Sequence, residues 1–275
     1  MEALKVNIRK MTLRLLVSTT LLLASQCIFA ASSCDISAII KKAWPDAQTT
    51  AEGVLTTNKQ FIKTQNDSPF SAICRIWPAH PELTLAAVPL LNDKPGMFNQ
   101  AGDLELLVLD SITLDIRQRL QLSDKMSSDV FEITGLALDT ARWKIAPDQT
   151  AFGLRIERTL SGSRSKKYEN TLWLYAIEKN QLRVVINGLV LIKNDGNGDM
   201  TCQGGYDDTT RTVTVENTTH HGYADIRVHE KNIHASQQLD ANGECGTTEK
   251  QSKRTWSLRY DGKQYPVPTA LSPLQ

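Results

Sequence analysis

The sequence lacks any long apolar run beyond its first 30 residues. No later window reaches the roughly 18 apolar residues that a membrane-spanning helix needs, so no transmembrane segment is expected. It also lacks an excess of charge of either sign, with 31 basic and 30 acidic side chains in 275 residues. Such a chain has no long-range attraction to nucleic acid or to an acidic membrane surface, and we expect it to bind neither.

Common catalytic motifs are also missing. The chain contains no G-x-S-x-G, H-E-x-x-H, P-loop or G-x-G-x-x-G pattern. The segment Ser163–Lys166 fits the S-x-x-K of penicillin-recognising enzymes, but that chemistry needs the motif on a helix and a K-T-G element elsewhere. Residues 161–168 are poor helix formers and no K-T-G occurs. We therefore predict a protein that is not an enzyme, has no catalytic residues and acts by binding.

Residues 1–30 have the pattern of a secretory signal peptide. A basic stretch with Lys5, Arg9, Lys10 and Arg14 precedes the apolar run 15–23, and Ile28-Phe29-Ala30 is a suitable cleavage site. Met1 and Met11 are alternative starts. The residues before Cys27 and Cys34 do not fit a lipidation signal, which argues against a lipid anchor. The sequence predicts a periplasmic mature chain, 31–275, with 27 basic and 29 acidic residues, forming a single all-β domain.

Cysteine is scarce, and four of the five cysteines follow the signal segment. An even number in an exported chain predicts disulfides, and four cysteines allow three pairings. Their wide spacing excludes a CxxC redox site or a zinc knuckle. Pairing by proximity joins Cys34 to Cys74 and Cys202 to Cys245, and this is the arrangement we expect.

One short helix and many strands are predicted. Asp35 can cap a helix over 35–44 that Pro45 ends, with Ile36, Ile39, Ile40 and Trp44 on one face. Alternating segments follow from about 53 to 267. A strand followed by a hairpin recurs three times, at 83–90 with 104–120, at 151–158 with 172–186, and at 222–230 with 256–267. Antiparallel hairpin repeats of this kind predict an open or degenerate propeller-like domain, or a sandwich.

The stretch 150–192 is the most strongly patterned part of the chain. It reads as a strand, a polar loop over 161–168, a second strand, a turn at Glu178–Gln181 and a third strand. Its segment FGLRIERTLSGSRSKKYENTLWLYAIEKNQLRVVI resembles one unit of periplasmic proteins with degenerate FG-GAP-like repeats, a group that includes periplasmic inhibitors of invertebrate-type lysozyme. The segment 220–226 keeps the Gly-Tyr-x-Asp-Ile part of a turn frequent in those units but not its acidic pair. The resemblance implies a β-rich periplasmic binding protein and an inhibitor of a cell-wall hydrolase.

The polar loop is the candidate partner-binding site. By its resemblance to the inhibitors' protruding loop, small hydroxyl residues would enter a narrow cleft, and cations would suit catalytic carboxylates. The alternative is an ordinary solvated loop between strands. The candidate residues are Ser161, Gly162, Ser163, Arg164 and Tyr168.

A second candidate is a metal site in the segment 194–199. Asp195, Asn197 and Asp199 have the alternate spacing that places oxygens around calcium, although the Gly and Glu of an EF-hand are missing at positions 200 and 206. The alternative is a Gly/Asn-rich turn, in which case no cofactor is needed. Four histidines within 220–234 form a third cluster, but His221, Asp225 and His229 on one strand are too far apart to share a metal, and we expect a solvated face.

These features predict an exported inhibitor or immunity-type protein that binds a protein partner, namely a peptidoglycan hydrolase. The alternatives are a structural cell-envelope factor and an exported hydrolase with an unrecognised site.

Overall fold

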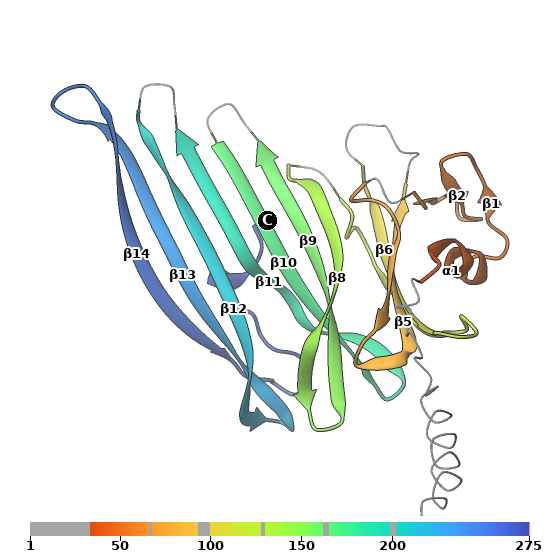
Figure 1. The fold of residues 1–275 in the computed structure, drawn as a ribbon. Coiled ribbons are helices and arrows are strands. Elements are labelled where there is room, and N and C mark those ends of the chain that lie inside the picture. Colours follow the sequence, from red (N-terminus) through yellow and green to blue (C-terminus); the bar gives the residue numbers. More distant parts are fainter. Residues whose placement is uncertain are drawn as a thin grey trace, which may run out of the picture. The chain divides into compact units, whose positions relative to one another are not determined.

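The strands form two antiparallel sheets, each of seven strands (Figure 1). The computed structural model describes residues 34–65, 68–92, 100–127, 130–161, 165–198 and 202–274. The predicted signal segment, 1–30, therefore lies outside the described residues. The predicted all-β class with a single short helix is confirmed, and no helix of the described ranges has the length and apolar character to cross a membrane.

The N-terminal sheet contains β1 (Gln48–Thr49), β2 (Gly53–Leu55), β3 (Phe61–Lys63), β4 (Ile73–Trp77), β5 (His80–Leu91), β6 (Gly102–Asp110) and β7 (Ile116–Leu122). The C-terminal sheet runs in chain order from β8 to β14: β8 (Glu132–Ala146), β9 (Gln149–Ser161), β10 (Ser165–Glu178), β11 (Gln181–Gly198), β12 (Gly204–His220), β13 (Tyr223–Leu239) and β14 (Cys245–Leu258).

Helix α1 (Ile36–Ala43) covers one face of the N-terminal sheet. Asp35 caps it as predicted, because its Oδ1 accepts hydrogen bonds from the backbone N–H groups of Ser37 and Ala38. The buried Ile39 and Ile40 pack on alternate residues of β5 and β6. The predicted Cys34–Cys74 disulfide is present and joins the start of the helix to β4.

The other face of the N-terminal sheet packs against the C-terminal sheet. Trp77 of β4, Phe152 of β9 and Tyr175 of β10 form an aromatic chain through this core, with ring centroids 5.3 and 5.8 Å apart. Burial on both faces explains why β5 and β6 have continuous apolar runs where a half-exposed strand would alternate.

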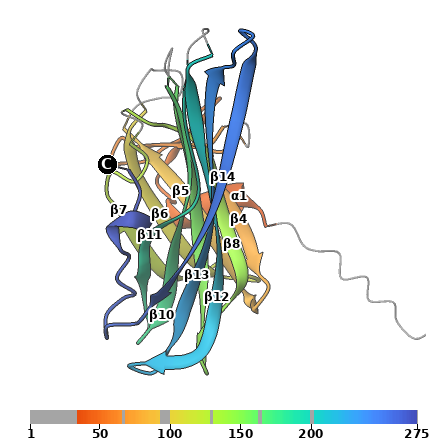
Figure 2. The same ribbon diagram turned by 90° about the vertical axis from the view of Figure 1, so that its left-hand side faces the viewer.

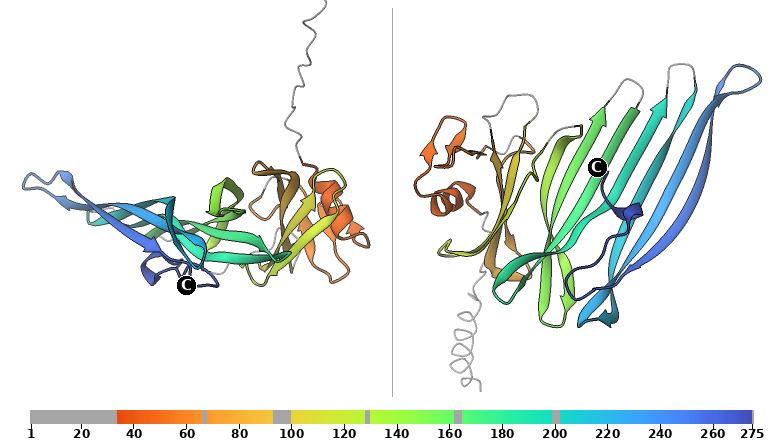
Figure 3. Two further views of the ribbon diagram at one scale, coloured as in Figure 1. Left: turned by 90° about the horizontal axis from the view of Figure 1, so that it is seen from below. Right: turned by 180° about the vertical axis from the view of Figure 1, so that it is seen from behind.

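The C-terminal sheet divides along the boundary between β11 and β12. These strands pair only from Ile192 opposite Thr210 to Gly198 opposite Gly204, although both extend well beyond Ile192 and Thr210. Alongside the unpaired part of β11, Tyr265 of the C-terminal segment (residues 259–274) makes a parallel bridge to Ile186. Figures 2 and 3 show this segment against one side of the sheet. It contributes Tyr260, Tyr265 and Leu271 to a second core cluster.

Three arginines bind the backbone of the C-terminal segment. Arg158 donates to the carbonyl of Leu274 at 2.9 Å, Arg211 to that of Ala270 at 3.2 Å, and Arg183 to that of Lys263. The carboxylate of Glu169, which is fully buried, binds both Arg158 and the N–H of Leu274. The segment is thus an integral part of the fold.

The predicted hairpin units agree with the structure in two of three cases. Strand β5 leads into the β6–β7 hairpin, and β9 leads into the β10–β11 hairpin. The prediction of a third hairpin at 256–267 was wrong. Asp261 and Gly262 do form a turn, but β14 ends at Leu258, and after the turn Tyr265 makes a parallel bridge to Ile186 of β11. Partners elsewhere in the fold outweigh the local hairpin preference of an Asp-Gly pair.

Candidate functional site at the hairpin end of the C-terminal sheet

Three connections of the C-terminal sheet lie at the same end of it. In an antiparallel sheet of sequential strands, alternate connections lie at the same end of the strands. The β9–β10, β11–β12 and β13–β14 connections therefore lie at one end of the sheet (Figure 1). We call this region the hairpin end and define it by the described residues 157–161, 165–170, 192–198, 204–210, 231–239 and 245–253. The described parts of the two sequence-predicted sites, 165–168 and 194–197, are therefore neighbours on paired strands.

The predicted polar loop 161–168 is much shorter than expected. Strand β9 continues to Ser161 and β10 begins at Ser165, with Lys166 paired to Ser161. Tyr168 is not in a loop: it lies within β10 between Thr159 and Asn194. The loop was predicted because the segment is polar, but strands with two solvated faces are polar too. Gly162, Ser163 and Arg164 lie outside the described residues.

Residues 194–198 belong to strand β11, so the alternative of a Gly/Asn-rich turn at these positions was wrong. Asp195 pairs with Lys167 on one side and Asp207 on the other, and Asn197 pairs with Ser165 and Gly205. Neighbouring strands on both sides provide hydrogen-bond partners for the backbone N–H and C=O groups of this segment, and a local turn would leave more of these groups without a protein partner. Asp199, the third proposed calcium ligand, lies outside the described residues, and the side chain of Asp195 forms an ion pair with Lys167 at 3.2 Å.

Charged side chains form complementary pairs across the hairpin end. Within the row that contains Lys167 and Asp195, Asp207 also contacts His234 at 3.1 Å. In the adjacent rows Asn194 donates to Asp208 at 2.6 Å and Tyr206 donates to Glu249 at 2.7 Å. The hydrogen bond to Glu249 raises the pKa of the Tyr206 hydroxyl. Cross-strand pairs of this kind order the surface.

The second disulfide stabilises the same region. Cys202 precedes β12 and Cys245 is the first residue of β14, and they are bonded as predicted. The bond therefore connects the β11–β12 connection to the β13–β14 connection. Together with the ladder pairing, it limits how far neighbouring hairpins can move apart. The hairpin end is a polar surface with charges of both signs, held in place by strand pairing and a disulfide, which suits binding.

Burial at Tyr168 is greater than a loop position would give. Its ring is half-buried, and desolvation, followed by the nearby Glu157 carboxylate, raises the pKa of its hydroxyl. Lys166, the lysine of the S-x-x-K pattern, is in β10 and thus on a strand. The helical arrangement that this motif requires is therefore not formed at Lys166.

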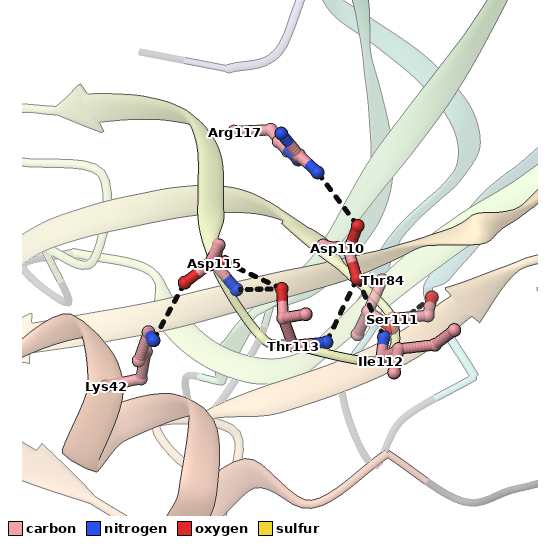
Figure 4. Close-up of polar contacts among 8 residues, drawn as sticks. All are labelled: Lys42, Thr84, Asp110, Ser111, Ile112, Thr113, Asp115 and Arg117. Atoms are coloured by element: carbon pink, nitrogen blue, oxygen red, sulfur yellow. Dashed lines mark hydrogen bonds and ion pairs between the residues drawn. The ribbon is translucent and has the colours of Figure 1, made fainter.

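A separate polar cluster occupies the β6–β7 turn (Figure 4). Asp110 accepts from the backbone N–H groups of Ile112 and Thr113, both at 3.0 Å, and from Arg117 at 2.9 Å. These hydrogen bonds, led by that from Thr113, lower the pKa of Asp110. Asp115 likewise binds Lys42 of α1 at 2.8 Å. Ser111 also hydrogen-bonds Thr84 of β5 at 2.9 Å. The contacts of this cluster shape the turn or attach it to α1 and β5, so the cluster has a structural role.

The histidine cluster differs in one respect from the solvated face predicted for it. His221 and His229 are exposed, but Asp225 is 4% exposed. Its carboxylate accepts from Thr218 at 2.7 Å and contacts Nδ1 of His220 at 2.6 Å. Burial opposes ionisation, yet these contacts outweigh it and lower the pKa of Asp225. In the part of the chain that the structure describes, no group of three His, Cys, Asp or Glu side chains could hold a metal ion.

Comparisons with known proteins do not indicate a function. No family model, curated protein or solved structure matches the chain. The geometry of the sheet is therefore the basis for a functional proposal. The sequence analysis missed the roles of Arg158, Glu169 and Arg211. The one sign of them in the sequence is that each is a charged residue within a segment that forms a strand.

Proposed function

We propose that the protein is a periplasmic binding protein that docks a peptidoglycan hydrolase at the hairpin end and inhibits it. The observation that carries this proposal is the β9–β10 hairpin, which is paired without a register shift from Phe152 opposite Tyr175 to Ser161 opposite Lys166. The three residues Gly162, Ser163 and Arg164 connect the two strands. Small and cationic residues between two regularly paired strands would suit a narrow cleft that contains carboxylates.

The surrounding contacts support docking with little loss of conformational entropy. Lys167 is held by Asp195, and the ring of Tyr168 is half-buried between neighbouring strands. The Cys202–Cys245 bond connects the adjacent hairpins. A surface whose side chains are already ordered loses less entropy when a partner binds. The disulfides are compatible with an exported protein, since such bonds persist in oxidising compartments.

The test is an inhibition assay on invertebrate-type lysozyme and on envelope amidases. Replacement of Ser161, Ser163 and Arg164 together by Ala should weaken inhibition by about 30-fold or more, the order expected of a hot spot worth about 2 kcal/mol. Stability should change by no more than about 0.5 kcal/mol if these side chains are exposed.

A matched control lies at the opposite end of the same sheet. Arg142, Lys144 and Asp148 are exposed near the β8–β9 turn, and their replacement by Ala should leave inhibition unchanged. A purified protein that inhibits none of these enzymes would refute the proposal. So would a hairpin-end variant that inhibits as well as the wild type.

A further inference from the structure

A polar pocket of about 380 Å³ lies where the C-terminal segment meets the C-terminal sheet. Its volume is in the range of small-molecule sites. One wall is the C-terminal segment, through Ala270, Ser272 and Leu274. The remainder comes from four neighbouring strands, β11 to β14.

Strand register assembles the floor of this pocket. Lys193, Thr209, Asn232 and Ser252 are successive cross-strand partners, and directly paired residues share a face of the sheet. This row spans roughly 14 Å, three inter-strand spacings. Arg211, Glu230 and Arg254 form the next row on the same face, and Trp256 stands two residues beyond Arg254.

The charges of the pocket are unbalanced. Its lining has three cations, Lys193, Arg211 and Arg254, and one carboxylate, Glu230. The carboxylate is used internally, because it binds Nε of Arg211 at 2.8 Å, and the two side chains are 6% (Arg211) and 9% (Glu230) exposed. No acidic side chain of the described ranges forms an ion pair with Lys193 or Arg254. Glu169 and Glu230 stand directly opposite Lys193 and Arg254 in the strand register, but their carboxylates bind Arg158 and Arg211. Among the described residues the two pocket cations therefore have no ion-pair partner of their own, and an anion would lower their repulsion.

The uncharged lining favours a sugar over a simple anion. Thr209, Ser252 and Ser272 offer hydroxyls and Asn232 an amide, groups that match the hydroxyl edge of a saccharide. Asn232 donates to Thr209 at 3.0 Å, which orients its side chain toward the floor. Half-buried Trp256 supplies an aromatic surface for the C–H face of a sugar ring.

The pocket is held open by a contact that does not depend on a ligand. Arg211 directs its other two nitrogens to backbone carbonyls, that of Val190 at 2.8 Å and that of Ala270 at 3.2 Å. The wall formed by the C-terminal segment is therefore fixed to β11 and β12. From this arrangement we propose that the pocket is a binding site for an acidic saccharide, whose carboxylate or phosphate is held between Lys193 and Arg254. This site is independent of the inhibition proposed for the hairpin end.

Calorimetric titration of the full-length mature protein with four probes tests the site. Glucuronate and glucose 6-phosphate carry the anion and the ring, glucose lacks the anion, and inorganic phosphate lacks the ring. At least one acidic sugar should bind 10-fold or more tightly than both glucose and phosphate. Lys193→Gln and Arg254→Gln should each weaken that binding at least 5-fold, and Trp256→Leu should do the same.

Lys253→Gln is the matched control, since Lys253 neighbours Arg254 in β14 on the opposite face of the sheet, and it should bind like the wild type. The hairpin-end triple variant should also bind normally, which separates this site from the proposed inhibition. The proposal is overturned if no acidic sugar binds, if glucose or phosphate binds equally well, or if the Lys193 and Arg254 variants match the control.

Discussion

Arg211 donates a hydrogen bond from Nη1 to the backbone carbonyl of Val190 at 2.8 Å, across the point where β11 and β12 separate. On the N-terminal side of Val190, Tyr265 of the C-terminal segment lies beside β11 at Ile186. On the C-terminal side, from Ile192 onward, β11 and β12 pair directly. The same guanidinium binds Glu230 of β13 and Ala270. One side chain thus joins four parts of the chain where the sheet divides.

Replacing Arg211 by Met should reduce the free energy of unfolding by about 3–5 kcal/mol. The substitution leaves the buried Glu230 carboxylate without its partner, and removal of one member of a buried ion pair has costs of this order. Urea denaturation of the mature protein provides the measurement.

The double substitution Arg211→Met with Glu230→Gln separates the two effects. It should recover part of the loss, because no unpaired buried charge remains. A single variant within about 0.5 kcal/mol of the wild type would show that Arg211 does not hold the divided sheet together.

The two disulfides should contribute similarly to stability but differently to local motion. Their sequence separations are 40 and 43 residues, for which the chain-entropy model gives about 4 kcal/mol each. Replacing Cys202 and Cys245 by Ala should speed amide hydrogen exchange at the hairpin end, whereas replacing Cys34 and Cys74 should speed it around α1. Uniform acceleration in both variants would contradict this division of roles.

Much of the fold was accessible from the sequence where apolar residues supply a period. The capped helix at Asp35, the strands around Leu85 and Leu106, and the Lys179-Asn180 turn with positive φ at both residues follow from local pattern and composition. The disulfide pairing followed from proximity along the chain.

The hairpin end could not be read in this way. Strand residues 245–255 have no apolar alternation, and in 231–239 only Ile233, Ala235 and Leu239 interrupt a polar run, so the pairing of these strands depends on backbone hydrogen bonds with neighbours. The place of Tyr265 depends on the gap left by β12, a long-range relationship that no local pattern records. For the same reason no local pattern shows that residues 165–168 and 194–197 lie on paired strands.

Lys125 gives a prediction about pH. Its Nζ lies 3.9 Å from the centre of the Trp173 ring, and burial, with a smaller contribution from Arg158, lowers its pKa to about 8 from 10.5. Asp124 lines the same pocket, and the nearby Glu169 carboxylate is bound to Arg158. The folded state therefore releases the Lys125 proton at lower pH than the unfolded chain does.

Between pH 8 and 10 the unfolded chain binds more protons at Lys125 than the folded state, so this group makes unfolding less favourable as pH rises. Comparison of wild type with Lys125→Met over this range cancels the titration of other groups. The stability of the wild type relative to the variant should increase with pH. A constant difference would mean that the pKa of Lys125 is not lowered.

Site-specific photo-cross-linking in the periplasm tests the docking surface most directly. A cross-linking amino acid at position 163 should form an adduct with an exported peptidoglycan hydrolase. The same amino acid at position 112, where Ile112 is 93% exposed on the β6–β7 turn, should form none. A hydrolase adduct at position 163 alone is the predicted result. Adducts of equal yield at both positions, or no hydrolase adduct at position 163, would contradict the account.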